Sequence, residues 1–241
     1  MSDTRDWIGD AERWIEEQFD RVVRAAGERG MLEIKPALAA EEAEWLMLGV
    51  EADLFNVTSE GYVSSELLPA PPVKNKPQKT VQLFWHYETG RRLFREGVCQ
   101  MAAAATLVLR YGWQRREVYF EPSRAELGAL AYGVDLLVRD ADQGRVVVCC
   151  EVKRNEQELE RLLLDMRVCG ARSPHGKADC DPRAMSNHPK VATCREVRPQ
   201  YFWAVCPGRS EAFRVDYGGE TVVLHEIGEL PDRVAALKNS S

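Results

Sequence analysis

The chain has 241 residues, of which 45% are hydrophobic and 29% are charged. This composition is ordinary for a folded globular protein, and it excludes a disordered chain, a collagen-like chain and a small disulfide scaffold. The formal net charge of −6, from 32 basic and 38 acidic residues, taken alone argues against a general nucleic-acid coat protein, which needs excess positive charge.

The cysteines do not form the pattern of a secreted protein. There are 7 of them, an odd number at irregular spacing. The first residues of the chain are polar and acidic, and they lack the basic start and the apolar core of a secretory signal. The longest clean apolar run, from Met101 to Leu109, is too short to cross a bilayer. We therefore expect a cytoplasmic protein with reduced thiols and no membrane partner.

Charge is divided unevenly along the chain. Residues 1–70 hold 6 basic and 16 acidic residues, a net of −10, whereas the other 171 residues hold 26 basic and 22 acidic residues, a net of +4. The division falls at a stretch rich in proline and lysine, residues 69–80, which we expect to be an extended linker. The sequence therefore predicts an acidic, mainly helical N-terminal piece (1–68) and a second domain (81–241).

The N-terminal piece begins with an amphipathic helix. Its apolar residues recur at helical spacing from Trp7 to Ala26, and Gly27 or Gly30 can end it. The elements expected after it are a strand at 31–35, a short helix at 40–48 and a loop region up to residue 68. The aromatic stripe of the first helix is typical of a cap that packs on the main domain. A contact surface for a protein partner is the alternative.

The second domain is predicted to alternate helices and strands. A long helix is expected first, over residues 83–110. The elements expected after it are strands at 116–121, 132–139 and 145–152, a helix at 155–169, a strand at 201–206 and a C-terminal hairpin within 211–226. The intervening segment, residues 170–200, is rich in Gly and Pro and is expected to be a long loop.

The second and third of these strands carry the most informative residues. They flank a turn rich in Asp and Gly, so we expect them to pair as a hairpin. If the turn centres on Gln143, the numbers of paired residues sum to 286, and Asp135 lies opposite Glu151. Because side chains alternate along a strand, Glu151 and Lys153 share a face while Val152 points away.

Three ionisable groups therefore meet at the end of otherwise apolar strands. Two carboxylates buried together need a cation or hydrogen bonds to offset the cost. Mg²⁺, or Mn²⁺ in its place, suits such a site because it prefers hard oxygen ligands and retains waters. Lys153 would stabilise charge on an attacked phosphate or help to deprotonate a metal-bound water. The alternative is a buried ion pair in an ordinary sheet.

This pattern resembles that of the PD-(D/E)xK nuclease superfamily. Asp135 is followed sixteen residues later by Glu151-Val152-Lys153, with Val134 where the motif's name has Pro. The expected order of helix, three strands, helix and strand over about residues 83–206 resembles the restriction-endonuclease-like core. The resemblance implies an α/β (α+β) fold in which helices flank a mixed central sheet, with the acidic helical piece as an N-terminal extension.

The resemblance also implies an activity. It implies a divalent-metal-dependent nuclease acting on DNA rather than RNA, and an endonuclease rather than an exonuclease. Asp135 and Glu151 would hold the metal with help from the Val152 carbonyl, and Lys153 would be catalytic. A homodimer is left open, because cutting two strands usually needs two active sites. The alternative function is a non-catalytic nucleic-acid-binding or protein-assembly module that retains the nuclease fold.

Further site residues are expected on the two neighbouring helices. Many members of the superfamily add a glutamate from the helix before the first strand, and Glu96 is the best match, with Glu88 and Glu121 as alternatives. Some members use a polar residue on the helix after the lysine. Gln157 fits that place as a contact to nucleic acid.

Phosphate contacts are expected from arginines outside the carboxylate cluster. Residues 71–120 hold 9 basic and 3 acidic residues, a net of +6. Arg91, Arg92 and Arg95 could offer part of a helix surface to a nucleic-acid backbone, and Arg154 follows the catalytic lysine. The alternative is a solvated helix face.

Five potential metal ligands lie at the end of the predicted helix at 155–169 and in the segment that follows. They are Cys169, His175, Cys180, His188 and Cys194. They include neither a Cys-x-x-Cys nor a His-x-x-x-His pair, and zinc sites usually show a close pair, so Zn²⁺ is not expected. The alternative is a substrate-binding insertion whose basic residues reach phosphates.

Overall fold

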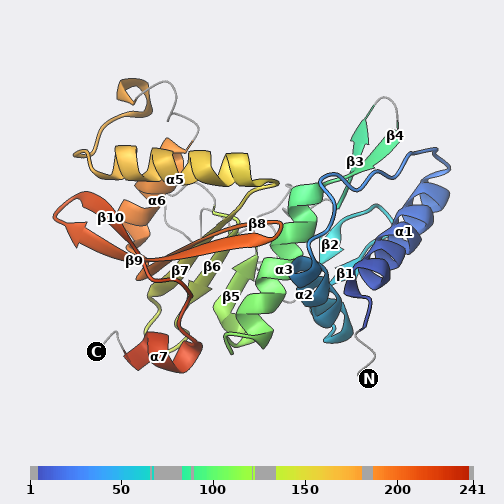
Figure 1. The fold of residues 1–241 in the computed structure, drawn as a ribbon, viewed down its shortest axis with the longest axis horizontal. Coiled ribbons are helices and arrows are strands. Elements are labelled where there is room, and N and C mark those ends of the chain that lie inside the picture. The colour runs from blue at the N-terminus through green and yellow to red at the C-terminus, as the bar shows by residue number, and fades with distance from the viewer. Residues whose placement is uncertain are drawn as a thin grey trace, which may run out of the picture.

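The computed structural model describes most of the chain, namely residues 5–65, 67, 83–87, 90–120, 122, 134–180 and 187–238. These residues form a mixed α/β fold in which a six-stranded mixed sheet has helices on both faces (Figure 1). The predicted linker at 69–80 lies outside the described residues, as do Glu88 and Glu121.

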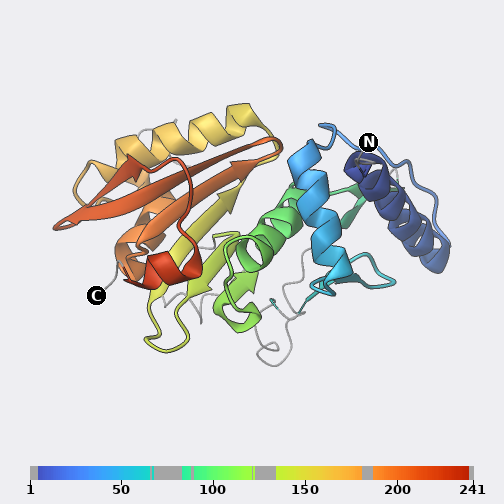
Figure 2. The same ribbon diagram turned by 60° about the horizontal axis from the view of Figure 1, so that its bottom comes forward.

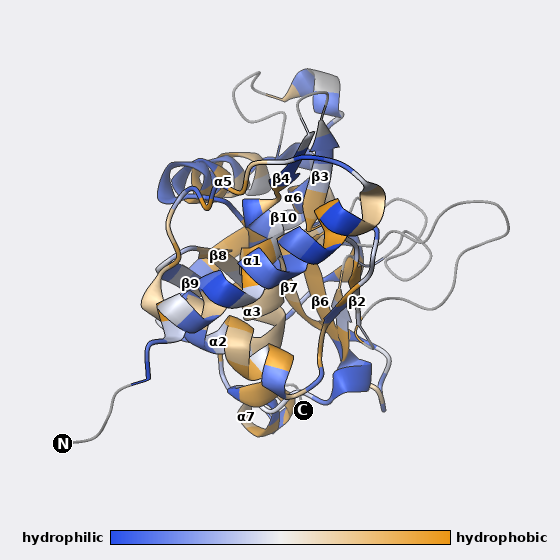
Figure 3. Ribbon diagram, turned by 90° about the vertical axis from the view of Figure 1, so that its right-hand side faces the viewer, coloured by the Kyte–Doolittle hydropathy of each residue, from blue (hydrophilic) through white to orange (hydrophobic). Residues whose placement is uncertain are grey.

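The first predicted helix is confirmed as α1 (Trp7–Ala26). The side chain of Asp6 caps its start by accepting a hydrogen bond from the backbone N–H of Gly9, and Gly27 ends it in the left-handed conformation with φ 64°. Hydrophobic and hydrophilic residues alternate along α1 (Figure 3). The residues it buries are Ala11, Ile15, Phe19 and Val22. The apolar stripe therefore packs inward, as expected for a cap.

The rest of the N-terminal piece departs from the prediction in two places, residues 31–35 and the segment expected to be a loop up to residue 68, which holds two short strands. α2 (Ala40–Glu51) forms, and β1 (Asn56–Val57) pairs with β2 (Val63–Ser64). The expected strand at 31–35 was wrong: these residues have no regular structure, and only Gly30 makes an isolated bridge there.

The long helix expected over 83–110 was wrong in its first part. β3 (Phe84–Tyr87) and β4 (Gly90–Leu93) pair as an antiparallel hairpin, and α3 (Arg95–Leu109) begins only after them. Aromatic residues favour strands. Gly90 has φ 110°, and a Cβ there would lie 2.4 Å from the carbonyl oxygen of Arg29, so this turn requires glycine.

The main sheet has the strand order β10-β9-β8-β7-β6-β5. Its strands are β5 (Val118–Phe120), β6 (Leu136–Arg139), β7 (Val146–Val152), β8 (Tyr201–Cys206), β9 (Arg209–Gly218) and β10 (Thr221–Glu226). β7 and β8 run parallel, and the other neighbours in this sheet are antiparallel. The bounds of β8 are those predicted, and the C-terminal hairpin joins the main sheet.

The predicted register between β6 and β7 is confirmed from Leu136 to Val138, but a β-bulge between Val138 and Arg139 shifts it by one residue beside the turn. Leu136 lies opposite Cys150, and Leu137 lies opposite Cys149, so the paired numbers sum to 286. Asp135 precedes β6 and continues this register, because its N–H donates to the carbonyl of Cys150 at 3.1 Å. Asp135 and the end of β7 are therefore held together by backbone pairing.

Helices cover both faces of the sheet. α5 (Glu156–Gly170) lies along one face (Figure 2), where it shares a hydrophobic cluster with α6 (His188–Val197). A second cluster joins α1, α2, α3 and the opposite face. α5 confirms the helix predicted at 155–169, whereas α6 lies in the segment expected to be a loop. None of the described helices is both long enough and apolar enough to span a bilayer.

A C-terminal helix was not predicted. α7 (Arg233–Lys238) is tied to the short 3-10 helix η1 (Arg115–Glu117), which precedes β5. The Arg233 guanidinium donates to both carboxylate oxygens of Glu117 at 2.7 and 2.8 Å. The Glu117 side chain is fully buried, so this ion pair fixes the C-terminus to the core.

Candidate functional site

Five ionisable side chains meet at one end of the sheet: Glu96, Asp135, Glu151, Lys153 and Lys190. They come from four parts of the fold. Glu96 lies in the first turn of α3, Asp135 precedes β6, Glu151 and Lys153 lie at the end of β7, and Lys190 lies in the first turn of α6. The starts of two helices and the end of a buried strand thus bring together residues far apart in sequence.

Glu151 lies at the centre of this cluster and is fully buried. Lys153 Nζ lies 3.0 Å from Glu151 Oε2 and 3.8 Å from Glu96 Oε1. Lys190 Nζ lies 2.5 Å from Glu151 Oε1. Asp135 Oδ2 accepts a hydrogen bond of 2.6 Å from the backbone N–H of Val152. Each carboxylate oxygen of Glu151 therefore faces a lysine, and Asp135 is fixed against the backbone of β7.

The environment raises the pKa of two of the carboxyl groups. Burial, helped by the charge of Asp135, raises the pKa of Glu96 from 4.5 to about 7, although Lys153 opposes the rise. Burial and then the charge of Glu151 raise the pKa of Asp135 from 3.8 to about 6. Both groups can exchange a proton near neutral pH.

The other three groups stay charged. Burial acts to raise the pKa of Glu151, but Lys190 and Lys153 outweigh it and hold that pKa below its usual value. Burial acts to lower the pKa of Lys153 and of Lys190, and in both cases the nearby carboxylates outweigh it and raise the pKa. The site thus offers two fixed ammonium groups beside two carboxyl groups that titrate near neutrality.

The predicted set of Glu96, Asp135, Glu151 and Lys153 is therefore brought together. The carbonyl of Val152, expected to assist a metal, accepts a hydrogen bond of 2.8 Å from Lys153 Nζ. Lys190 was missed as a member of the site, because the sequence carried no local signal relating residue 190 to residue 151.

Two of the arginines expected to contact phosphates have structural partners instead. The Arg95 guanidinium is buried, donates to both carboxylate oxygens of Glu42 and donates to the Pro36 carbonyl at 2.8 Å. Arg91 pairs with Glu28 at 2.9 Å and is 12% exposed. The prediction for Arg95 was wrong, and Arg91 is largely committed to the N-terminal piece.

The remaining expected contacts are more accessible. Arg92 is exposed on β4, and Arg154 is exposed and pairs with Glu158. Gln157 lines an open groove of about 590 Å³ that leads to Lys153. The other residues lining this groove are Glu158, Glu160, Arg161, Leu164 and Asn187. Its charge is mixed rather than uniformly basic.

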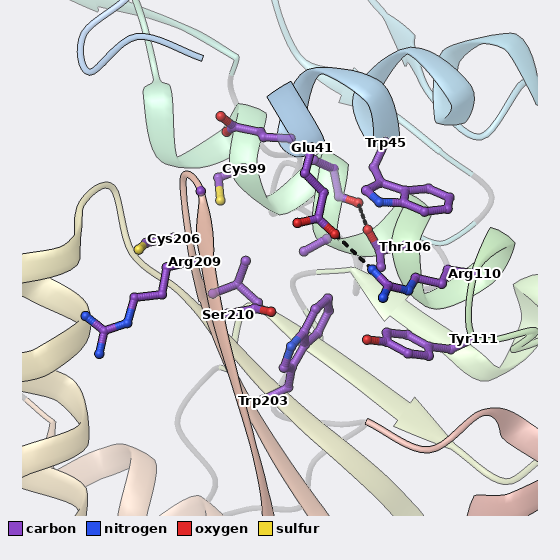
Figure 4. Close-up of a pocket in the computed structure, with 15 residues that line it drawn as sticks. Glu41, Trp45, Cys99, Thr106, Arg110, Tyr111, Trp203, Cys206, Arg209 and Ser210 are labelled. Atoms are coloured by element: carbon purple, nitrogen blue, oxygen red, sulfur yellow. Dashed lines mark hydrogen bonds and ion pairs between the residues drawn. The ribbon is translucent and has the colours of Figure 1, made fainter. Parts of the chain in front are cut away.

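A second hollow lies between α2, α3 and the start of β9 (Figure 4). Its volume is about 50 Å³, which is more than one water molecule needs. Arg110 lies beside Tyr111 there and pairs with Glu41 at 2.8 Å.

The prediction for metals needs correction. Cys169, His175, Cys180 and His188 place one ligand atom each within 4.8 Å of one another. In the described part of the chain this is the one group of three or more His, Cys, Asp or Glu residues that meets this spacing, and the carboxylates around Glu151 do not meet it. The expectation of Mg²⁺ or Mn²⁺ held by Asp135 and Glu151, with no zinc, was therefore wrong. The donor set suited to a metal is made of Cys and His.

The chain was compared with known proteins. No family model, no curated protein and no solved structure matches it. The resemblance to the PD-(D/E)xK nucleases therefore stays a prediction that rests on the residues and on the order of the elements.

Proposed function

We propose that the chain is a phosphodiesterase of the nuclease class with a restriction-endonuclease-like core, and that it cleaves nucleic acid at the cluster around Glu151. The resemblance favours DNA over RNA as the substrate. The observation that supports this proposal is the convergence of Glu96, Asp135, Glu151 and Lys153, to which Lys190 adds a second cation. Such a group of carboxyl and ammonium groups matches the needs of phosphodiester hydrolysis.

In this reaction a water oxygen forms a new bond to phosphorus, and the bond from phosphorus to the leaving sugar oxygen breaks. The water must lose a proton, and the leaving oxygen must gain one. Asp135 and Glu96, with pKa values of about 6 and about 7, suit proton acceptance and donation near neutrality. Lys153 and Lys190 stabilise the negative charge that grows on the phosphoryl oxygens.

Glu151 acts as a positioning residue in this scheme. Its two oxygens face the two lysines at 3.0 and 2.5 Å. Because the carboxylate is buried and ionised, it holds both ammonium groups in fixed places. The groove beside Lys153 gives an extended substrate a way to the site.

A non-catalytic nucleic-acid-binding or assembly module is the second candidate function. The observation that favours it is that Glu151 forms ion pairs with two lysines, as in a buried ion pair kept for structure. In that case the cluster would stabilise the fold, and binding would depend on exposed residues such as Arg92.

The test measures cleavage by the full-length chain of linear, circular, branched and single-stranded DNA and of RNA. Each reaction is run without added metal, with a panel of divalent ions and with EDTA. Comparing the cleavage rates in these conditions shows whether an ion contributes to cleavage. Asp135→Asn and Lys153→Met are expected to lower cleavage by about a hundredfold or more. The matched controls are Asp20→Asn and Lys238→Met, which alter exposed residues on α1 and α7, and both should cleave normally.

Two outcomes would contradict the proposal. One is full cleavage by both site variants, which would place the chemistry elsewhere. The other is no cleavage under any condition, combined with nucleic-acid binding that Lys153→Met leaves unchanged. That second result would favour the non-catalytic module.

A further inference from the structure

A compact Cys/His cluster lies outside the candidate functional site, in the crossover between β7 and β8. Cys169 comes from the last turn of α5, and His175 from the loop after it. Cys180 directly follows the 3-10 helix η2 (Lys177–Asp179), and His188 is the first residue of α6. Both cysteines and His188 are buried, whereas His175 is partly exposed. Four separate parts of the crossover between β7 and β8 thus meet at one point.

The distances in this cluster fit a tetrahedral ion. Cys169 Sγ lies 3.6 Å from His175 Nε2 and 3.3 Å from His188 Nδ1. For an ion bound by sulfur at about 2.3 Å and by nitrogen at about 2.0 Å, the edge of a tetrahedron that joins sulfur to nitrogen is about 3.5 Å. These two separations therefore match those of bound zinc, and all four ligand atoms lie within 4.8 Å of one another.

The neighbouring backbone orients one of the imidazoles. His175 Nδ1 lies 2.8 Å from the carbonyl oxygen of Ser173. A carbonyl only accepts, so Nδ1 carries the proton and donates it, which leaves the lone pair of Nε2 facing Cys169. A second-sphere hydrogen bond of this kind is typical of histidines that bind metals.

Arginines secure the loop that carries the ligands. Arg195, on α6, donates to the carbonyls of Cys169 at 3.1 Å and Arg172 at 2.6 Å. Arg172 in turn donates to the carbonyl of Asp179 at 3.2 Å. Residues 171–174 are all exposed, so apolar packing contributes little to holding this loop. An ion bound to four side chains would supply the missing constraint.

We propose that Cys169, His175, Cys180 and His188 bind one Zn²⁺ ion, and that this ion fixes the start of α6 so that Lys190 reaches Glu151. Four protein ligands fill a tetrahedral site, so the ion is structural rather than catalytic. Two thiolates also balance the charge of Zn²⁺. The link to Lys190 is direct, because it lies two residues after His188 in the first turn of α6. The metal site stands apart from the proposed nuclease activity, and Lys190 is the link proposed between them.

The first experiment measures the metal content of the untagged full-length chain after growth with zinc, iron, manganese and magnesium. About one zinc per chain is expected. Cys169→Ser, Cys180→Ser and His175→Ala should each lose most of it. His175→Ala disturbs the core least, since that side chain is partly exposed. Cys194→Ala is the matched control, because Cys194 is a buried cysteine of α6 outside the ligand set, and it should keep its zinc.

Substitution with Co²⁺ gives an independent readout. The chain refilled with Co²⁺ should show the visible absorption of a tetrahedral ion bound by thiolates, and Cys169→Ser or Cys180→Ser should weaken the thiolate band. A chain that binds neither ion, or a Cys194→Ala variant that loses zinc as readily as Cys169→Ser, would overturn the metal site.

The structural role is tested by amide hydrogen exchange before and after zinc is removed with a chelator. Peptides from α6 should exchange about tenfold faster or more once the ion is gone, whereas peptides from β7 should change little. Unchanged exchange in α6 would refute the role of the ion in positioning Lys190. This readout does not depend on cleavage, so it remains valid if the proposed nuclease activity fails.

Discussion

The substitution Glu96→Gln should make the protein more stable at alkaline pH. Glu96 is 25% exposed in its side chain and has a pKa of about 7 in the folded protein, against 4.5 for an ordinary glutamate. Because the folded-state pKa is raised, the stability linked to this group is fully present below about pH 4.5 and is lost as the pH rises through about 7. Glutamine carries no charge at any pH, so the variant avoids the loss.

The size of the effect follows from the two pKa values. The difference between about 7 and 4.5, at about 1.4 kcal/mol per pH unit, corresponds to about 3 kcal/mol at full ionisation. Most of this loss falls between about pH 5 and pH 8, so the advantage of Glu96→Gln over the unchanged chain should grow by about 2 kcal/mol or more across that range.

Urea unfolding followed by tryptophan fluorescence measures this effect at each pH. The matched control is Glu16→Gln, which changes an exposed carboxylate on α1 and should leave the pH dependence as it was. If the advantage of Glu96→Gln is the same at pH 5 and pH 8, then burial near Asp135 does not govern the ionisation of Glu96, and the proposed proton exchange at this site loses its basis.

Two further predictions concern buried ion pairs. Arg95→Met should lower the free energy of unfolding by about 3 kcal/mol, because it leaves the buried carboxylate of Glu42 unpaired; if the variant is instead as stable as Arg92→Met, the pair does not hold α2 to α3. Arg233→Ala should cost about 2 kcal/mol near neutral pH, since burial acts to raise the pKa of Glu117, and Arg233 together with backbone hydrogen bonds outweighs it and lowers that pKa. That cost should shrink as the pH falls below about 4.5, where the carboxyl group becomes protonated. Unfolding curves at several pH values check this, and a cost independent of pH would contradict it.

The sequence predicted the centre of the sheet well, because local rules govern it. The turn rich in Asp and Gly predicts that β6 pairs with β7, and alternation along β7 then places Glu151 and Lys153 on one face. The helix expected before the first strand also forms, as α3, and it carries Glu96 in its first turn. In each case one short segment contained all the information needed.

The sequence failed where contacts between distant segments decide the structure. The first part of the expected helix at 83–110 instead forms the hairpin of β3 and β4. Its turn at Gly90 lies close against the backbone of Arg29. α6 was missed because the segment before it is rich in Gly and Pro, although Pro189 suits the first turn of a helix. The Cys/His cluster gave no close ligand pair to detect, since the chain folds back several times to assemble it.

The hydrophobic cluster that α1 and α2 share with α3 and the sheet also determines what would happen if the backbone were cut within residues 69–80. The acidic N-terminal fragment would remain bound to the rest of the chain, through its buried apolar stripe and the pairing of Glu42 with Arg95. Expressed separately, the two fragments should each be unstable and should reassemble into one folded complex when mixed. The −10 charge of residues 1–70 would thus be a permanent part of the folded surface.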